Sequence, residues 1–437
     1  MIGEKTSKEE LLQIAKKYQM YSWDHLPIIF VEGKGTRIKD IDGKEYIDCT
    51  SQAWTLNVGH QHPRVIQSVK EQIDRMVFAF GLYFEHIPKL DLLKKLADIS
   101  PGNLKKVLFA VTGSEAMEAA MQLSMKYKKA QNIIAFYHGY HGRTFATIAA
   151  SLAAPTFVKL QHSLEKFMNG MIKVPNWYCY RCYFKMTYPD CGLICADFVE
   201  SAIRNAGSER IAGVMLEPIQ AQGGHIDPPK EYLPKIREIC DTYDVPLIFD
   251  EIQTGFGRTG KMFACEYYNT MPDFLVIGKG LSAGFPLSAV LTSEKFNLFE
   301  SGDFGFTHAA HPLSCAAAIS VIDIIRDEKL LDNSARMGAV LSKGLKEVEE
   351  RYEMIGDVRC PGLFIGVEFV EDKKSKKPAT EKTKKFLSEC IRRGVLFGRS
   401  GVGEFGNVVK IKPPLNISRE EVDKVLEVFE GSLKAIT

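Results

Sequence analysis

Residues 245–253, Val245-Pro-Leu-Ile-Phe-Asp250-Glu-Ile-Gln253, contain the pattern that decides the fold. The first five residues are apolar, which is typical of a strand buried on both faces of a sheet. The run then ends abruptly in carboxylate and amide groups. In open parallel sheets, ligands lie just beyond the carboxyl ends of the strands. The stretch therefore predicts an α/β domain with a ligand near Asp250.

Short apolar runs of the same kind recur between residues 65 and 310, separated by segments of helix length. They are Val107–Val111, Ile133–Phe136, Gly213–Leu216, Phe274–Ile277 and Ala289–Leu291. This alternation indicates an α/β domain built on a mostly parallel sheet. Both ends of the chain show mixed helix and strand patterns that suit a smaller α+β lobe. We therefore expect three segments, 1–64, 65–312 and 313–437, of which the first and last form that lobe.

The composition favours a globular protein with a small-molecule partner. Of 437 residues, 45% are hydrophobic, and 56 lysines and arginines nearly balance 54 aspartates and glutamates. No broad charge field therefore argues for nucleic acid or an anionic membrane. No apolar run approaches the roughly 20 residues that span a bilayer, and residues 1–10 mix charges where a secretory signal needs an apolar core. We expect a cytoplasmic protein with ten reduced cysteines.

Lys279 follows the next buried strand, in Phe274-Leu-Val-Ile-Gly-Lys279-Gly280, between glycines that let a ligand approach the backbone. Taken alone, Asp250 could be a helix cap or a surface carboxylate, and Lys279 a solvated loop charge. A strand-end aspartate and a strand-end lysine together supply what pyridoxal phosphate requires. The carboxylate faces the pyridinium nitrogen, and the amine reacts with the aldehyde.

A phosphate site is expected at Thr112-Gly-Ser-Glu-Ala116, between the strand Val107–Val111 and a helix that runs to about Lys129. The unpaired amides and the dipole at the start of this helix face an incoming anion. The same residues could form an ordinary N-cap. Their position after a strand of the same sheet favours phosphate binding by Gly113 and Ser114.

With these motifs the sequence resembles the class III aminotransferases, fold type I pyridoxal-phosphate enzymes, over nearly the whole chain. In pattern it is most similar to ω-amino acid and amine:pyruvate aminotransferases. The matching motifs, in the family's order, are Thr112-Gly-Ser-Glu-Ala-Met-Glu-Ala-Ala, Tyr140-His-Gly-Arg-Thr144, Glu217-Pro-Ile-Gln220, residues 250–260, Gly278-Lys-Gly-Leu, residues 307–312 and Lys410-Ile-Lys-Pro-Pro-Leu415.

The resemblance implies a role for each matching residue. Lys279 would form the internal aldimine and move the proton, Asp250 would pair with the ring nitrogen, and Gln253 would lie near the ring hydroxyl. The other implied cofactor contacts are Gly113 and Ser114 on the phosphate, Tyr140 stacked on the ring, His141, and Glu217 as a supporting residue. Thr307 would reach the phosphate of a neighbouring subunit, which implies a homodimer or a dimer of dimers with shared sites. The alternative for Tyr140 is a core aromatic.

The substrate side departs from the glutamate–arginine gate of several family members. Gln222 stands in the place of the glutamate and Lys410 in that of the arginine. Lysine cannot offer a planar bidentate fork, so we expect carboxylate recognition to be weaker there or to lie elsewhere. Arg399 resembles the mobile arginine of ω-amino acid aminotransferases, with a surface charge as the alternative. Trp54 and Tyr83 would form an apolar pocket wall, and Trp54 could instead be a core residue.

These features favour an aminotransferase whose donor carries its amine distal from any acid group. Such donors are ω-amino acids, aminosulfonates and amines, with pyruvate or 2-oxoglutarate as acceptor. The alternative within enzymes is an amino-acid racemase, epimerase or decarboxylating relative that uses the same site. A metal-binding or structural protein that keeps a disused aminotransferase fold is disfavoured by the intact Lys279, Asp250, Gly113 and Thr307.

Four cysteines form a separate cluster in a tyrosine- and proline-rich insertion: Cys179, Cys182, Cys191 and Cys195. Their spacing can satisfy a tetrahedral zinc ion. The intervening loop is shorter than in usual zinc ribbons, and the thiols could equally be packed or paired in disulfides. The active site itself is expected to hold no metal.

Overall fold

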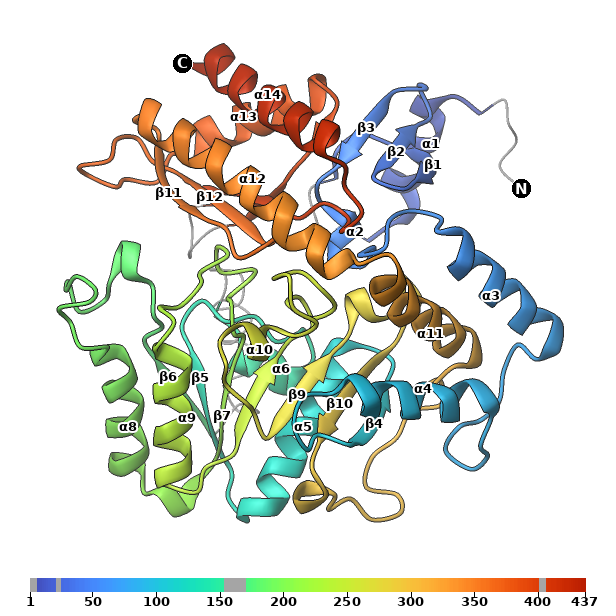
Figure 1. Ribbon diagram of the computed structural model, residues 1–437, viewed down its shortest axis with the longest axis vertical. Helices are drawn as coiled ribbons and strands as arrows, with labels where there is room; N and C mark the ends of the chain where they lie inside the picture. Colours follow the sequence, from blue (N-terminus) through green and yellow to red (C-terminus); the bar gives the residue numbers. More distant parts are fainter. Residues whose placement is uncertain (1–5, 21–24, 153–169, 401–405) are drawn as a thin grey trace.

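A seven-stranded sheet forms the centre of the larger part of the molecule, and a smaller part with two four-stranded sheets lies above it in Figure 1. The computed structural model describes residues 6–20, 25–152, 170–400 and 406–437. The fold is the α/β architecture that the sequence predicts. Within the described ranges, every helix is too short or too polar to cross a membrane.

The large sheet has the order β4-β10-β9-β8-β7-β5-β6. Its strands are β4 (Lys106–Ala110), β5 (Asn132–Phe136), β6 (Met171–Val174), β7 (Ile211–Leu216), β8 (Leu247–Asp250), β9 (Phe274–Ile277) and β10 (Ser288–Thr292). β10 runs antiparallel to both of its neighbours, β4 and β9, and the other pairs are parallel. The sheet is therefore mostly parallel, as expected, with β6 as a strand that the apolar runs did not reveal.

Helices surround this sheet. They are α3 (Pro63–Arg75), α4 (Ile87–Ile99), α5 (Gly113–Lys128), α6 (Phe145–Ala150), α8 (Ile194–Ala206), α9 (Tyr232–Thr242), α10 (Ala264–Tyr267) and α11 (Pro312–Asp327). α5 packs across β4, β7, β8, β9 and β10, and α11 packs against α3 and α4. Every residue of β7, β8 and β9 is buried, which explains their continuous apolar sequences.

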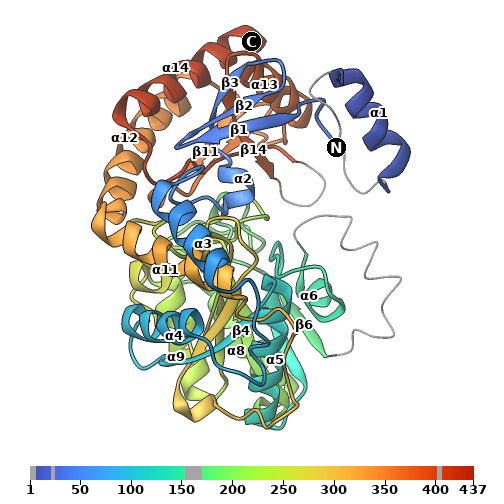
Figure 2. The same ribbon diagram turned by 90° about the vertical axis from the view of Figure 1, so that its right-hand side faces the viewer.

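The two ends of the chain form the smaller part together. One sheet joins β1 (Phe30–Lys34), β2 (Arg37–Asp40) and β3 (Glu45–Asp48) to β13 (Val395–Leu396), and the other has the order β11-β12-β15-β14 (Ile355–Arg359, Ile365–Phe369, Val408–Ile411, Gly398–Ser400). Its helices are α12 (Leu330–Arg351), α13 (Thr380–Arg392) and α14 (Arg419–Ile436), and α1 (Lys8–Tyr18) lies beside β1–β3 (Figure 2). The parallel pairing of β13 with β3 supports one lobe made from both ends. The division at residues 64 and 312 stays a prediction.

Residues Ser51–Trp54 (α2) link the two parts in an unusual conformation. Their φ angles are 45°, 47°, 58° and 69°, in the left-handed region, although none is glycine. Such backbone costs about 1–2 kcal/mol per residue, so it needs support from its surroundings. Asp48 supplies it by accepting hydrogen bonds from Thr50 N (2.9 Å) and Gln52 Nε2 (3.1 Å). The turn directs Trp54 towards the junction of the two parts.

Close packing of α12 against a loop generates a stability prediction. A Cβ atom on Gly338 would lie 2.5 Å from the carbonyl carbon of Gly362, whose own position is restricted because its Cβ would lie 2.6 Å from Arg258 O. Gly338→Ala should therefore lower the free energy of unfolding by roughly 1–3 kcal/mol, as overpacking does. Urea denaturation measures this change.

Gly344→Ala, on the same helix, is the matched control. Its nearest neighbour is a flexible methyl group of Leu426 at 2.6 Å, which can move aside. Gly344→Ala should leave the free energy of unfolding nearly unchanged, because the gain in helix propensity offsets the cost of moving the Leu426 methyl group. Equal urea midpoints for the two variants would contradict this packing.

Candidate active site

A cavity of about 180 Å³ lies at the carboxyl ends of β8 and β9. It is lined by Gly113, Ser114, Tyr140, His141, Gly142, Glu217, Asp250, Ile252, Gln253 and Lys279. Every cofactor residue that the sequence suggested, apart from Thr307, therefore lies around one space. Gly142 and Ile252 are additional lining residues that the sequence did not single out.

Asp250 and Lys279 meet because β8 and β9 are adjacent and parallel, with Asp250 beside Val276 in the register. Parallel neighbours end at the same edge of a sheet, so the carboxylate and the amine project into the same cavity. Lys279 begins a 3₁₀ turn that ends at Leu281. A Cβ on Gly278 would lie 2.6 Å from Ser288 Oγ, so only glycine fits before the lysine. Burial lowers the pKa of the Lys279 amine, and the charge of Asp250 opposes this shift.

The Asp250 carboxylate is held by two donors. His141 Nδ1 lies 2.8 Å from Asp250 Oδ2, and the backbone N–H of Ile252 donates to Oδ1 at 3.1 Å. The histidine is fixed in turn, because its backbone N–H donates to Ser151 Oγ at 2.9 Å. His141 Nε2 is buried with no hydrogen-bond partner among the described residues. The histidine thus orients the carboxylate in a buried site.

Glu217 supports the part of the cavity wall that carries Tyr140. Its carboxylate accepts the backbone N–H groups of Tyr140 (2.9 Å) and Ala221 (3.0 Å). Burial, and then the charge of Asp250, raise the pKa of Glu217 to about 7. Glu217 therefore fixes the segment that carries Tyr140, as a buried acceptor of backbone hydrogen bonds.

The start of α5 forms a cradle with the chemistry of an anion site. Thr112 and Glu115 make a capping box, and Ser114 Oγ accepts the N–H of Arg143 at 3.1 Å. A Cβ on Gly142, whose φ is 140°, would overlap Ser114 Oγ and would lie 2.6 Å from Thr147 Oγ1. Backbone amides and a hydroxyl can thus approach a ligand closely at a helix N-terminus, which suits a phosphate group.

Trp54 is surrounded by amines. Lys410 Nζ and Lys412 Nζ each lie 4.0 Å from its ring centre, and Lys279 Nζ lies 6.0 Å away. Lys410 also donates to Gln222 Oε1 at 3.1 Å. The sequence suggested Trp54 and Lys410, and the structure brings them together. Lys412 was not predicted from the sequence as a site residue, although the second lysine of Lys-Ile-Lys in an otherwise apolar segment could have indicated it.

Trp54 and Lys410 lie beside the cavity without lining it, and three further suggested residues lie away from the site. Arg399 is exposed on β14, and its neighbour Ser400 donates its hydroxyl to Gln222 O, so Arg399 faces the other side of the strand. Tyr83 is 81% exposed, and Thr307 is exposed as well. A single chain does not bring these residues to the site.

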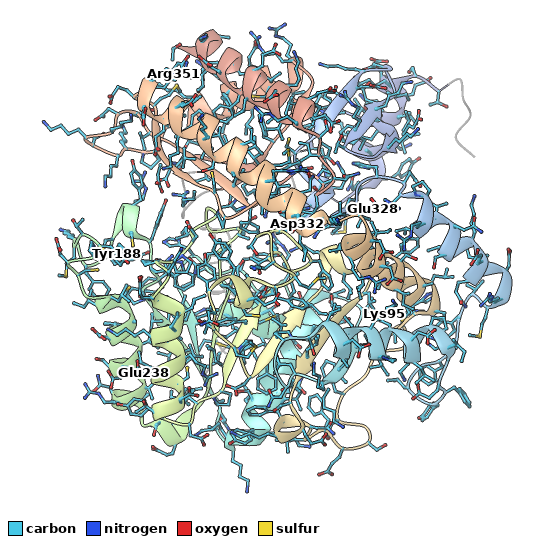
Figure 3. All side chains as sticks on the ribbon, in the orientation of Figure 1. Lys95, Tyr188, Glu238, Glu328, Asp332 and Arg351 are labelled. Atoms are coloured by element: carbon cyan, nitrogen blue, oxygen red, sulfur yellow. The ribbon has the colours of Figure 1, made fainter. Side chains whose placement is uncertain are left out.

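The cysteine insertion packs on the smaller part of the molecule. Cys179 is exposed, Cys182, Cys191 and Cys195 are half-buried, and all four are free thiols. Among the described residues, no group of three or more histidine, cysteine, aspartate or glutamate side chains could hold a metal ion. The insertion is instead anchored through Arg181, which donates to Glu368 at 2.6 Å. Tyr188 lies at its outer end in Figure 3.

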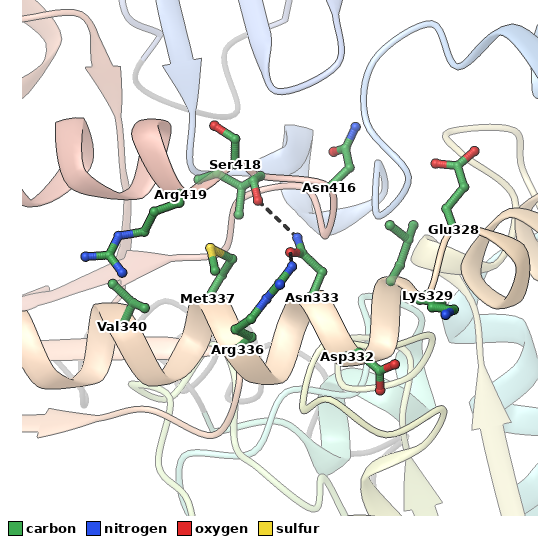
Figure 4. Close-up of a pocket in the computed structure, with 12 residues that line it drawn as sticks. Glu328, Lys329, Asp332, Asn333, Arg336, Met337, Val340, Asn416, Ser418 and Arg419 are labelled. Atoms are coloured by element: carbon green, nitrogen blue, oxygen red, sulfur yellow. Dashed lines mark hydrogen bonds between the residues drawn. The ribbon is translucent and has the colours of Figure 1, made fainter.

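A second hollow, of about 880 Å³, lies between α12 and the segment before α14 (Figure 4). Its polar contacts are structural, because Asn333 donates to the carbonyl groups of Leu415 (2.7 Å) and Ile417 (3.0 Å). It contains none of the residues suggested by sequence. Asp332, one of its lining residues, lies at the start of α12 in Figure 3.

Comparison with known proteins identifies the family. The class III aminotransferase model matches residues 18–433, and the chain belongs to this family. Among similar proteins, 5-aminovalerate aminotransferase of Pseudomonas putida is 34% identical over 92% of this chain and 93% of its own length. The leucine/methionine racemase of Thermococcus litoralis is 32% identical over 94% and 91%. The crystal structure of the omega transaminase from Pseudomonas jessenii in complex with PMP superimposes with a TM-score of 0.90, at 28% identity over 97% and 98% of the two chains.

The chain is therefore an enzyme of the aminotransferase type that uses pyridoxal phosphate. Its cavity fits this cofactor. The cradle at α5 offers donors for a phosphate, and a carboxylate and an amine project from adjacent strand ends into the same space. The glycine at position 142 leaves the room that the cradle needs.

Gly142→Ala tests the cradle. The added methyl group would displace the Ser114 hydroxyl, and losing a hydrogen bond to a charged group costs about 1.5–3 kcal/mol. Titration of apoenzyme with pyridoxal phosphate, followed by absorbance, should show affinity reduced by about tenfold or more. Gly302→Ala is the control, because Gly302 also has positive φ but no neighbour within 4 Å of the added Cβ. Equal affinities for the two variants would contradict the assignment of the cradle.

Proposed function

We propose that this enzyme transfers an amino group from an ω-amino acid, aminosulfonate or amine to a 2-keto acid, pyruvate or 2-oxoglutarate, by a ping-pong reaction. The main support is the convergence of Asp250 and Lys279 on one cavity, next to a wall formed by Trp54 and buried lysines. Pyridoxal phosphate, when bound, supplies an aldehyde for the amine and a ring that accepts electrons.

The residues at the strand ends carry the chemistry in this proposal. The Lys279 amine, whose pKa is lowered by burial, binds the cofactor aldehyde and, once released, moves the proton removed from the substrate carbon. Asp250, oriented by His141, keeps a proton on the ring nitrogen. Gly113 and Ser114 bind the phosphate. Three further residues complete the site: Tyr140 stacks on the ring, Gln253 lies near the ring hydroxyl, and Glu217 holds the Tyr140 segment.

Lys410 binds the acid group of the substrate in this proposal. Its partner Gln222 is an amide, so it has no charge with which to neutralise the lysine. No carboxylate of this pair therefore competes with the substrate for the Lys410 ammonium in either half-reaction, unlike an arginine gated by a glutamate. Trp54 forms the wall beside it. Arg399 can contribute only by swinging in from its exposed position.

We also propose a homodimer, or a dimer of dimers, with shared sites. Exposed apolar side chains gather before and at the start of α4: Met76, Val77, Phe78, Leu82, Tyr83, Phe84, Ile87 and Leu90. Phe78 contacts His308, next to Thr307, with ring centres 5.4 Å apart. A large apolar patch marks a protein interface. A partner subunit that covers this patch would contact Thr307 and Tyr83. These two residues could then reach the active site of the partner subunit.

A cytoplasmic location is part of the same proposal. All ten cysteines are free in the structure, as is usual in a reducing compartment.

Isomerisation of amino acids is the second candidate function. It is favoured by relatives named leucine/methionine racemase, isoleucine 2-epimerase and alanine/serine racemase, which are 31–33% identical to this chain. The same aspartate and lysine can serve both reactions, because each begins with removal of a proton from the substrate carbon.

A half-reaction experiment separates the two functions. The pyridoxal form is mixed with 4-aminobutyrate, 5-aminovalerate, 2-aminoethanesulfonate or 1-phenylethylamine without keto acid, and its absorbance is followed. At least one donor should convert the cofactor to the pyridoxamine form, and pyruvate or 2-oxoglutarate should reverse the change. Lys279→Ala should show neither conversion. Racemisation of leucine or alanine without keto acid, with no conversion by these donors, would instead establish the isomerase.

Lys410 makes keto-acid binding depend on pH. Burial, and then the charge of Lys279, lower the pKa of Lys410 to about 7. The ammonium that binds a carboxylate is present below this pKa and is lost above it, so KM for the keto acid should rise about tenfold per pH unit above 7. Lys410→Arg should flatten this rise, because a guanidinium stays protonated. Parallel pH profiles of KM for the two enzymes would contradict the role of Lys410.

A further inference from the structure

Lys412 is a buried lysine that no carboxylate of the described residues pairs with. Its side chain is 0% exposed, and its Nζ lies 4.0 Å from the ring centre of Trp54 and 3.9 Å from that of Phe364. Within the described part of the chain it forms no ion pair, and its hydrogen-bond acceptor is Gln253 Oε1 at 3.0 Å. Burial, and then the charges of Lys410 and Arg258, lower the pKa of Lys412 well below its ordinary value. A lysine at this position therefore calls for a functional explanation.

The backbone of Lys412 fixes the segment that carries Trp54. Its N–H donates to Cys49 O at 2.8 Å, and its carbonyl accepts the hydroxyl of Ser51 at 2.6 Å. Ser51 begins the left-handed turn that ends at Trp54. Lys412 thus connects the smaller part of the molecule to both the turn and the loop after β8.

The hydrogen bond from Lys412 determines which end of the Gln253 amide faces the cavity. The oxygen and nitrogen of a glutamine amide have nearly the same shape, so their placement follows from their partners. An amine that donates requires the oxygen on its side. The Gln253 oxygen therefore faces Lys412, and its NH₂ group is left for the cavity that Gln253 lines.

We propose that Lys412 is a positioning residue that holds Gln253 with its NH₂ group directed at the ring oxygen of pyridoxal phosphate. The proposal rests on the proposed place of Gln253 beside that oxygen. An N–H donated to the oxygen spreads its negative charge, which weakens its hold on the proton shared with the Lys279 nitrogen. Lys412, through Gln253, therefore keeps low the pH at which this proton is half dissociated.

The test is the pH midpoint of the visible absorbance change of the holoenzyme. Lys412→Met removes the donor, and Gln253→Met removes the amide at similar volume. Each should raise the midpoint by about 0.5–1 pH unit. In a Gln253→Met background, Lys412→Met should shift the midpoint no further, because coupled residues are not additive. A residue that served only packing would leave the midpoint unchanged.

Two results would overturn the proposal. One is an unchanged midpoint in Lys412→Met. The other is a shift of the same size with and without Gln253, which would mean that the lysine acts through its charge alone. If Lys412→Met does not fold, Lys412→Gln tests the proposal in its place, because glutamine keeps an N–H donor without the charge of lysine. Its midpoint should stay within about 0.2 pH unit of the wild type, whereas a rise as large as that of Gln253→Met would reject the role.

The absorbance titration of the wild-type enzyme separates an error in the role of Lys412 from an error in the proposed aminotransferase function. Wild-type enzyme that binds no pyridoxal phosphate through Lys279 shows no such absorbance change at any pH. A normal wild-type titration with an unshifted Lys412→Met leaves the aminotransferase function intact and removes only the role of Lys412.

Discussion

The adjacent ends of β8 and β9 place a carboxylate and an amine in the same buried cavity, and the rest of the site depends on this arrangement. Burial lowers the pKa of Lys279, and the charge of Asp250 opposes this shift. The surrounding residues serve this pair. His141 orients the aspartate, and Glu217 fixes the backbone of Tyr140 in the cavity wall.

The substrate side follows from a second constraint, which is the collection of amines around Trp54. Two of them have separate partners, because Lys410 donates to Gln222 and Lys412 donates to Gln253. We infer that the first serves the acid group of the substrate and the second serves the cofactor. The left-handed turn that carries Trp54 makes this possible, and its conformational cost is offset by hydrogen bonds from within the smaller lobe.

The sequence predicted the elements whose signals are local. The strand Phe274–Ile277 has the predicted bounds, because a buried apolar run bounded by polar residues and glycine is visible in a short window. The antiparallel direction of β10 was not predictable in this way, since pairing depends on distant strands. Burial of Lys412 depends on the packing of two lobes, and the left-handed turn at Ser51 has no glycine to signal it. The exposure of Arg399 likewise reflects strand register rather than composition.

Three lysines near one tryptophan make the identity of the cofactor-bearing amine the central question. Reduction of the holoenzyme with borohydride, followed by proteolysis and mass spectrometry, locates the lysine that carries the cofactor. We expect a single modified residue, Lys279, because it alone of the three lines the cavity with Asp250. Modification of Lys410 or Lys412 in its place, or of no lysine, would contradict this structure of the site.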